Sequence, residues 1–287
     1  MLVELVKTAT ADGVRLDGAL ALPNVSPPAA ARADAILCLH GAGGNFYSSS
    51  LFEEIARQAT ESGIAVLRVN TRGATALSLS ATREGKRNQG AAYEIVADCV
   101  HDIAAWLELL GKRGFARVAL VGHSLGAVKS LYTQAHGPSS SVTAIAALSP
   151  PRLSYLAFRN AMSSGFFDCI ARAEELVAKG EGETLMEVRF PLPLLISAAG
   201  YVDKYGKAER YNYFRFLEQV RQPTMFVFGS EELAAGLIPF AGAPEEIARV
   251  PAHGPRRVEI VAGADHFYRG VEEDGAAVVR EWLISGK

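Results

Sequence analysis

Short apolar runs that alternate with helical patterns restrict the fold of this chain more than any other feature of its sequence. Each run is short enough to be a strand, and the first ones read as strands that are buried on both faces of a sheet. The runs lie at 34–40, 64–69, 117–122, 141–150, 223–229 and 256–261.

Helical patterns separate these strand-like runs. The clearest one has apolar residues in steps of three and four, which places them on one face of a helix. These residues are Tyr93, Val96, Val100, Ile103, Leu107 and Leu110. Further helices are predicted after residue 124 and at the C-terminus through Trp282. The alternation predicts an α/β fold with a mostly parallel sheet flanked by helices, and with functional loops at the carboxyl ends of the strands.

Two local signals add detail near the N-terminus. The dipeptide Asp12-Gly13 separates two strand-like runs and favours a hairpin turn, because both residues tolerate a positive φ. Ser50 is followed three residues later by Glu53, which is the pattern of a capping box at the start of a helix. The sequence therefore predicts a leading hairpin, and a helix that begins near Ser50.

Residues 151–222 interrupt the alternation, because they contain no convincing buried strand. They show helical patterns at 159–179 and 208–220 instead. An aromatic cluster lies in the same region: Tyr201, Tyr205, Tyr211, Tyr213, Phe214 and Phe216. We interpret the region as a helical cap inserted after the sixth strand, which leaves 1–150 and 223–287 as the core. The alternative is two further outer-layer helices whose aromatic faces belong to the core.

Composition excludes several classes of partner. The chain is 49% hydrophobic and 21% charged, with a formal net charge of -2, so it offers no broad attraction for nucleic acid or for an anionic membrane. A small-molecule partner is therefore expected. No run is long enough to span a bilayer, and the N-terminus lacks a secretory signal pattern. These features predict a soluble, cytoplasmic protein, and they leave its oligomeric state open.

The three cysteines support the same compartment. Cys38, Cys99 and Cys169 are widely separated, lie in apolar sequence and have no metal-ligand spacing. We interpret them as buried free thiols in a reducing environment.

The pentapeptide Gly122-His123-Ser124-Leu125-Gly126 follows a buried strand and opens a helix. A match to G-x-S-x-G arises by chance in roughly one chain in six, so the pentapeptide alone is weak evidence and the interpretation depends on its context. In a strand–turn–helix setting the serine is lifted clear of the backbone on a strained turn. Glycine is required on both sides, because a side chain there would crowd the neighbouring strand and helix. Ser124 is the predicted nucleophile.

A serine hydroxyl needs a base and an orienting carboxylate. His266 follows the last strand, and Glu232 follows the preceding one, which gives the order serine, acid, histidine. Glu231 is the direct rival of Glu232, and Asp203 is a more remote alternative. The other histidines, His101, His136 and His253, lie on a solvated helix face or in Gly/Pro-rich turns.

The same hypothesis requires donors for the oxyanion of a tetrahedral intermediate. The glycine-rich segment "HGAGGN" (40–45) follows a buried strand, and we assign the donors as the backbone amides of Ala42 and Leu125. The alternative for this segment is a simple glycine turn. The candidate substrate-binding residues lie near these loops or in the aromatic cluster: His40, Gly43, His123, Tyr201 and Tyr205.

Basic residues gather in the segment 80–90, where Arg83, Lys86 and Arg87 accompany Glu84. We interpret the segment as a solvated surface loop. Recognition of an acidic substrate group is the alternative.

Four motifs in this order resemble the α/β-hydrolase fold superfamily. "HGAGGN" resembles its oxyanion loop, "VNTRG" its loop after the next strand, "GHSLG" its nucleophile elbow and "GADHF" its histidine loop. The resemblance covers almost the whole chain outside 151–222. It departs at Asn70 and in "GSEE", where aspartate is the commoner residue at each position. "NFYSS", "NTRG" and "GHSLGAVKS" also resemble a subgroup similar to fungal siderophore-ester hydrolases.

Together these features predict a serine hydrolase that cleaves a carboxylic ester through an acyl-enzyme, without a metal or organic cofactor. The same machinery could cleave a thioester, an amide or a carbon–carbon bond, because the pocket selects the leaving group. A non-catalytic ligand-binding protein on the same fold is the alternative from a different class. The expected substrate is a medium-sized, partly hydrophobic small molecule.

Overall fold

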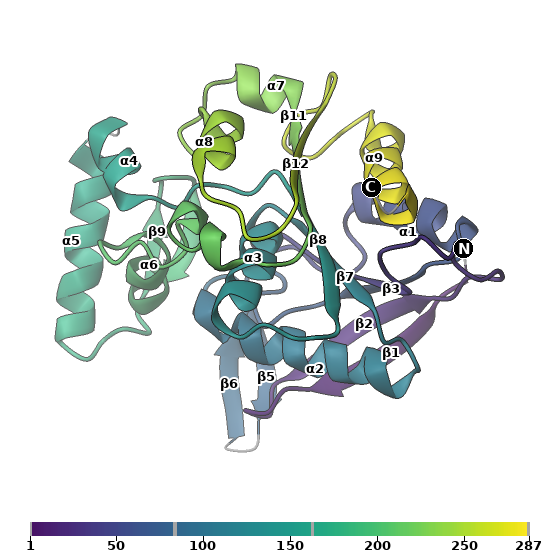
Figure 1. The fold of residues 1–287 in the computed structure, drawn as a ribbon. Coiled ribbons are helices and arrows are strands. Elements are labelled where there is room, and N and C mark those ends of the chain that lie inside the picture. The colour runs from purple at the N-terminus through teal and green to yellow at the C-terminus, as the bar shows by residue number, and fades with distance from the viewer. Residues whose placement is uncertain (1, 83–84, 162–163, 286–287) are drawn as a thin grey trace.

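The computed structural model describes residues 2–82, 85–161 and 164–285 (Figure 1). These residues form an eight-stranded sheet, here called the main sheet, in the order β1-β2-β4-β3-β7-β8-β11-β12. Its strands are β1 (Glu4–Ala9), β2 (Arg15–Ala21), β3 (Ala35–Leu39), β4 (Ala65–Val69), β7 (Val118–His123), β8 (Val142–Leu148), β11 (Thr224–Gly229) and β12 (Arg256–Val261). The predicted hairpin is confirmed, because β1 and β2 pair antiparallel across Asp12-Gly13. Within the main sheet, the six neighbouring strands β4, β3, β7, β8, β11 and β12 run parallel, so the predicted α/β fold is confirmed.

Helices cover both faces of the main sheet (Figure 1). The principal ones are α1 (Ser50–Glu61), α2 (Cys99–Lys112), α3 (Leu125–His136) and α9 (Glu272–Ser285). Successive residues of a strand point to opposite faces, and the core divides accordingly. Leu37 and Leu120 pack in a cluster with α2 and α3, whereas Ile36 and Val121 pack in a cluster with α1 and α9. Burial on both faces explains why these strands read as continuous apolar runs.

Two helix starts differ from the sequence prediction. The N-cap of α1 is Ser49 rather than Ser50, because the Ser49 hydroxyl accepts the Phe52 amide at 3.2 Å. The helix predicted from Tyr93 begins only with a 3₁₀ turn, η1 (Val96–Asp98), followed by α2. The first amides of this turn are capped by side chains from residues 151–222, an interaction that local spacing does not reveal.

The basic segment 80–90 is a hairpin rather than a loop. β5 (Ser78–Thr82) and β6 (Gly85–Gln89) pair antiparallel, and Lys86 and Arg87 are exposed. The predicted solvent exposure is therefore confirmed for these two residues. Arg83 and Glu84 lie outside the described residues.

Residues 151–222, here called the inserted segment, follow β8, the sixth strand of the main sheet. Their described part forms α4 (Tyr155–Ala161), α5 (Ser164–Ala178), β9 (Leu185–Val188), β10 (Leu194–Ser197), α6 (Ala198–Tyr205), η2 (Tyr213–Arg215) and η3 (Leu217–Gln219). Figure 1 shows α4, α5 and α6 gathered on one side of the main sheet. The prediction without strands was wrong, because β9 and β10 form a separate two-stranded sheet. The helix predicted at 208–220 is a pair of 3₁₀ turns instead.

The aromatic cluster of the inserted segment belongs mostly to the core. Tyr201, Tyr211 and Tyr213 are completely buried, and the rings of Tyr211 and Phe216 pack edge-on against Tyr132 of α3. These rings are therefore part of the core, as the alternative interpretation of this region expects. The rings join the inserted segment to α3, because this contact removes large apolar surfaces from water.

The cysteine prediction holds in part. Cys38 and Cys99 are buried free thiols, whereas Cys169 on α5 is only partly buried, so its predicted burial was wrong. The described residues include no helix that is long and apolar enough to cross a membrane.

Candidate active site

The carboxyl edge of the main sheet brings the predicted catalytic residues together. Ser124 follows β7, and His266 lies in the loop after β12. Glu232 lies in α7 (Ser230–Ala234), directly after β11. Because β7, β8, β11 and β12 are parallel neighbours, the loops after them meet at the same edge.

Ser124 occupies a strained turn between β7 and α3. Its backbone has φ 55° and ψ -124°, a conformation that a residue with a side chain rarely adopts and that costs on the order of 1–3 kcal/mol. A Cβ on Gly122 would lie 2.3 Å from the Gly126 carbonyl oxygen, and one on Gly126 would lie 1.9 Å from the Leu39 carbonyl oxygen. The predicted crowding at both glycines is therefore confirmed. The turn holds its shape because helix and strand pack directly on its backbone.

Hydrogen-bond distances connect Ser124, His266 and Glu232. The His266 Nε2 lies 3.1 Å from the Ser124 Oγ, and the Nδ1 lies 2.5 Å from the Glu232 Oε1. Both ring nitrogens are thus engaged, so the orientation of the imidazole is fixed by its partners. This arrangement positions Nε2 to accept a proton from the serine hydroxyl.

Glu232 and its rivals have different surroundings. Glu232 is 4% exposed, and its second oxygen accepts the Ser149 hydroxyl at 2.7 Å. Glu231 is exposed and points its backbone amide to the Ala264 carbonyl. Asp203 lies on α6, where it accepts the Val96 amide and the Tyr211 hydroxyl. Of the three carboxylates, only Glu232 contacts His266.

His123 supports the loop that carries His266. Its Nε2 donates to the His266 carbonyl oxygen at 2.7 Å, and its ring lies 4.9 Å from the His266 ring. Burial, together with the nearby His266, lowers the pKa of His123 to about 4. A neutral His123 is therefore a hydrogen-bond donor that holds the loop, rather than a second base.

The segment 40–45 packs directly behind the nucleophile. A Cβ on Gly41 would lie 3.1 Å from the Ser124 Cβ, so the glycine allows the backbone to approach the serine. Ala42 and Leu125 both line the cavity described below. Neither backbone amide donates to another described residue, and that of Leu125 is the first in α3, where no intrahelical acceptor exists. Both amides are thus available to a ligand oxygen.

The loop after β4 fixes the segment 40–45 in place. The Asn70 side chain accepts the Phe46 amide at 3.0 Å, and the His40 Nε2 accepts the Thr71 amide at 3.1 Å. The other His40 nitrogen donates to the Gly41 carbonyl. Burial and the nearby Lys129 lower the pKa of His40 to about 4, so this ring is neutral near pH 7. Asn70, a position at which the sequence departs from the resemblance described above, thus holds the segment 40–45 through its side-chain oxygen.

A cavity of about 870 Å³ contains Ser124 and His266. Apolar side chains form much of its wall, including Leu153 and Phe158 from the inserted segment and Leu237 and Phe240 from the region between α7 and α8 (Ala243–Arg249). Of the predicted binding residues, the structure places three on the wall: His40, His123 and Tyr205. Gly43 lies outside the lining, and so does Tyr201, whose hydroxyl donates to the Phe190 carbonyl within the core.

Sequence reasoning missed a buried group of charges beside this cavity. Lys129 of α3 lies 2.5 Å from Glu94, and Lys204 of α6 lies 3.8 Å from the other oxygen of Glu94. All three side chains are almost completely buried, and Lys204 lines the cavity. Lysine and glutamate in helical patterns are normally surface residues, so the sequence carried no signal for this group.

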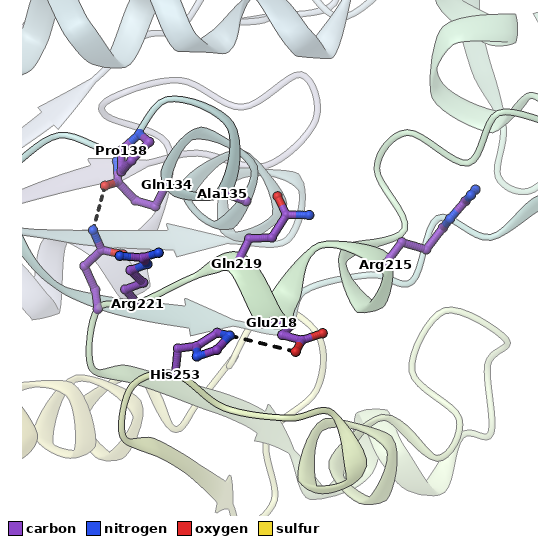
Figure 2. Close-up of a pocket in the computed structure, with 9 residues that line it drawn as sticks. Gln134, Ala135, Pro138, Arg215, Glu218, Gln219, Arg221 and His253 are labelled. Atoms are coloured by element: carbon purple, nitrogen blue, oxygen red, sulfur yellow. Dashed lines mark hydrogen bonds and ion pairs between the residues drawn. The ribbon is translucent and has the colours of Figure 1, made fainter.

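A second hollow of about 620 Å³ lies at the other edge of the main sheet, near the end of α3 and the start of β11 (Figure 2). Its wall includes Gln134, Arg215, Glu218 and His253. Figure 2 shows His253 directed toward Glu218. The His253 Nε2 lies 3.8 Å from the Glu218 Oε1. No Ser, Cys or Thr belongs to the described lining. The hollow therefore lacks the parts of a nucleophilic site.

The remaining histidines lie away from Ser124. His101 is exposed, and His136 stacks on Tyr132 at the far end of α3. Within residues 2–82, 85–161 and 164–285, no cluster of three or more His, Cys, Asp or Glu has an arrangement that could hold a metal ion.

Several solved structures align with almost the whole chain. Est1E from Butyrivibrio proteoclasticus, solved with ferulic acid bound, is 16% identical with a TM-score of 0.69, covering 97% of this chain and 98% of that chain. The α/β hydrolase GrgF from Penicillium sp. sh18 is 16% identical with a TM-score of 0.69, covering 99% and 100%. The esterase domain of a Rhodothermus marinus protein is 21% identical with a TM-score of 0.61, covering 99% and 96%. A comparison with curated protein sequences finds no significant match.

These likenesses define the class of protein by its architecture, which is the α/β-hydrolase fold. The model of the alpha/beta hydrolase family matches residues 36–283. The chain therefore belongs to the alpha/beta hydrolase family.

Proposed function

We propose that the protein is a serine esterase in which Ser124, His266 and Glu232 form the catalytic triad. The continuous path of hydrogen-bond distances from the Ser124 Oγ through both nitrogens of His266 to a buried glutamate carries this proposal. The path ends in a cavity large enough for a small-molecule ester. Relatives such as the Rhodothermus marinus esterase domain support the choice of an ester as substrate.

The first half of the proposed reaction acylates the enzyme. The Ser124 Oγ attacks the ester carbonyl carbon while the His266 Nε2 accepts the hydroxyl proton. The amides of Ala42 and Leu125 donate to the oxyanion that forms, and the strained turn presents Oγ to the cavity. The tetrahedral intermediate then collapses, the bond to the alcohol oxygen breaks, and His266 returns its proton to the leaving alcohol.

The second half releases the acid. Water takes the place of the alcohol, His266 accepts one of its protons, and the resulting oxygen attacks the acyl carbon. The bond to Ser124 Oγ breaks, and His266 gives the proton back to the serine. Throughout, the carboxylate of Glu232 keeps the Nδ1 proton in place and stabilises the imidazolium.

We further propose that the inserted segment acts as a cap that selects the substrate. Leu153, Phe158 and Tyr205 come from this segment and share one cavity wall with residues of the core 1–150 and 223–287. Their apolar surface suits a medium-sized, partly hydrophobic substrate. The resemblance to siderophore-ester hydrolases and the cytoplasmic location stay predictions.

A fluorophosphonate probe tests the proposed nucleophile. We expect wild-type protein to react with the probe and Ser124→Ala to stay unlabelled, because the probe forms a covalent bond with an activated serine. Ser140→Ala is the matched control, since this serine is exposed and follows the end of α3 opposite to Ser124. Equal labelling of wild type and Ser124→Ala would refute the nucleophile.

A substrate panel separates esters from the other bonds that the same groups can cleave. Esters, thioesters and amides with matched acyl chains would be compared by kcat/KM. The proposal predicts the highest value for esters. If the probe labels nothing and no substrate in the panel is cleaved, the non-catalytic ligand-binding alternative replaces it.

A further inference from the structure

Lys204 places a cationic side chain in the wall of the proposed active-site cavity. The residue is 4% exposed, although lysine is almost never buried unless it has a partner. Its ammonium donates no hydrogen bond to another described residue, and its closest carboxylate oxygen, on Glu94, is 3.8 Å away. A buried ammonium with free donors is costly, unless a ligand supplies the missing acceptor.

Glu94 does not account for Lys204, because another cation already neutralises this carboxylate. Lys129 lies 2.5 Å from Glu94 and also donates to the Thr71 hydroxyl at 3.0 Å. The group therefore has two ammonium ions for one carboxylate. Burial lowers the pKa of Lys204 and Lys129 adds to this shift, whereas Glu94 and Asp203 act against it; Asp203 is itself paired with Arg210. An anion beside Lys204 would complete the charge balance.

The rest of the cavity wall favours the same kind of ligand. None of its described lining residues is an aspartate or a glutamate. A second cation, Arg269, lies at the wall with its guanidinium over the Phe267 ring; its side chain is largely exposed and lies 3.9 Å from the Asp265 carboxylate, which is not part of the lining. A negatively charged ligand would thus meet two positive groups and no lining carboxylate.

The position of Lys204 is fixed by its own helix. The preceding residue, Asp203, accepts the Val96 amide at 3.0 Å and the Tyr211 hydroxyl at 2.7 Å. These bonds hold α6 against η1 and set the direction of the next side chain. Preorganisation of this kind reduces the entropy that a ligand must offset on binding.

We propose that Lys204 recognises a carboxylate group of the substrate, so that the preferred substrate is an ester that also carries a free carboxylate. This inference rests on the proposed esterase function and adds the charge of the substrate to it. The carboxylate pairs with the Lys204 ammonium inside the cavity, while the ester group of the same molecule lies at Ser124. The carboxylate belongs either to the acyl part or to the alcohol part, and the two arms of the test separate these cases.

Matched substrates test the inference. One arm uses monoethyl esters of straight-chain dicarboxylic acids of graded length, and the other uses acetyl esters of ω-hydroxy acids. Each is paired with its ω-amide, which has nearly the same shape and no charge. The measured quantity is the ratio of kcat/KM for the acid to that for the amide. We expect a ratio above one in at least one arm for wild type, and a decrease of about tenfold or more in Lys204→Met.

Two further variants test whether the acid-to-amide ratio of kcat/KM depends on a positive charge at position 204 in particular. Lys207→Met removes the same charge three residues away, where the ammonium is exposed and paired with Glu174, and it should keep the wild-type ratio. Lys204→Arg restores the charge and should recover part of the preference, mostly through KM. An unchanged ratio in folded Lys204→Met would overturn the inference.

Binding measurements keep the inference independent of folding and of catalysis. The same acids and amides would be titrated into wild type and into Ser124→Ala by calorimetry. Tighter binding of the amides than of the acids in both proteins would overturn the inference, even if Lys204→Met does not fold. Failure of every ester to react, with tight binding of the acids retained, would refute the esterase function and leave the anion site standing.

Discussion

Two buried glutamates near the same cavity differ in the partners that surround them. Glu232 accepts hydrogen bonds from His266 and from the Ser149 hydroxyl, and no lysine or arginine ion pair involves it among the described residues. Glu94 faces the ammonium groups of Lys129 and Lys204. Burial alone would raise the pKa of Glu94, but these two cations outweigh it and hold that pKa below its usual value.

The two carboxylates therefore differ in whether a permanent cation already neutralises them: Glu94 is neutralised by lysine, and Glu232 is not. The carboxylate of Glu232 can stabilise a positive charge when His266 takes a proton, because no permanent cation neutralises it. The carboxylate of Glu94 compensates existing cations and leaves one of them in excess. The region of Glu232 thus supplies negative charge to the proposed catalytic histidine, and the region of Glu94 supplies positive charge to the cavity wall.

Replacing Glu232 should have the largest effect of all, a loss of activity. We expect Glu232→Gln to lower kcat for an ester about 10⁴-fold, because an amide cannot hold the Nδ1 proton or stabilise the imidazolium in the same way. Steady-state kinetics measures the loss. Glu231→Gln is the matched control, since Glu231 is exposed, and a large decrease confined to this control would contradict the assignment.

Replacing Glu94 should destabilise the folded protein, because this carboxylate compensates two buried lysines. Glu94→Gln leaves the Lys129 and Lys204 ammonium groups buried without a counter-charge, which should lower the free energy of unfolding by about 3–5 kcal/mol. Denaturant unfolding measures the change. The double variant Glu94→Gln with Lys204→Met should recover part of the loss.

The control for this loss is Glu174→Gln, which removes an exposed glutamate paired with Lys207. It should change the free energy of unfolding by less than about 1 kcal/mol. Equal losses in Glu94→Gln and Glu174→Gln would show that the buried charges do not depend on Glu94.

Low pH should reduce the stability of the protein through His40, which lies near Lys129. Folding lowers the pKa of this ring from 6.5 to about 4. Between these pH values the ring is protonated in the unfolded chain and neutral in the folded chain. Stability should therefore decrease as the pH falls through this window, by about 3 kcal/mol for this group. In His40→Gln the free energy of unfolding should depend less steeply on pH.

The exposed His101 supplies the control for the pH experiment. His101→Gln should keep the wild-type slope between pH 6.5 and pH 4, measured as the free energy of unfolding at each pH. The same slope in His40→Gln as in wild type would argue against a neutral, buried His40.

The smallest expected effect concerns the neutral donor to Glu232. Ser149→Ala removes a hydroxyl that lies 2.7 Å from the carboxylate, and we expect kcat to fall about fivefold, because one hydrogen bond contributes about 1 kcal/mol. Ser154→Ala removes a similar bond from a buried serine to Glu209 and should leave kcat near wild type. If the two variants lose activity equally, the effect is one of general packing.

Local sequence was sufficient for the order of the main-sheet strands along the chain and for the turn at Ser124. Apolar runs specify buried strands, and glycines at 122 and 126 specify where helix and strand backbones meet. The same signals were less reliable at helix starts. The turn at Val96 is capped by Asp203, more than one hundred residues away, and no local pattern contains that bond.

The inserted segment shows where local reasoning fails. Its aromatic cluster provided two candidate binding residues, Tyr201 and Tyr205, but Tyr201 is a core residue like Tyr211 and Tyr213, and only Tyr205 lines the cavity. Lys204, which reaches the cavity, lies among them without any distinguishing pattern. Which side of a short helix faces the pocket depends on how the segment docks on α3, and docking is decided by contacts between distant residues.

The sequence by itself determined the alternating fold, the strained serine turn, and the order of serine, acid and histidine along the chain. These features follow from periodicity and from backbone conformation, which act between near neighbours. Only the tertiary structure decided that Glu232 rather than Glu231 contacts His266, and that Lys204 faces the cavity. Both depend on side-chain direction and burial, which are fixed when strands and helices far apart in sequence pack together.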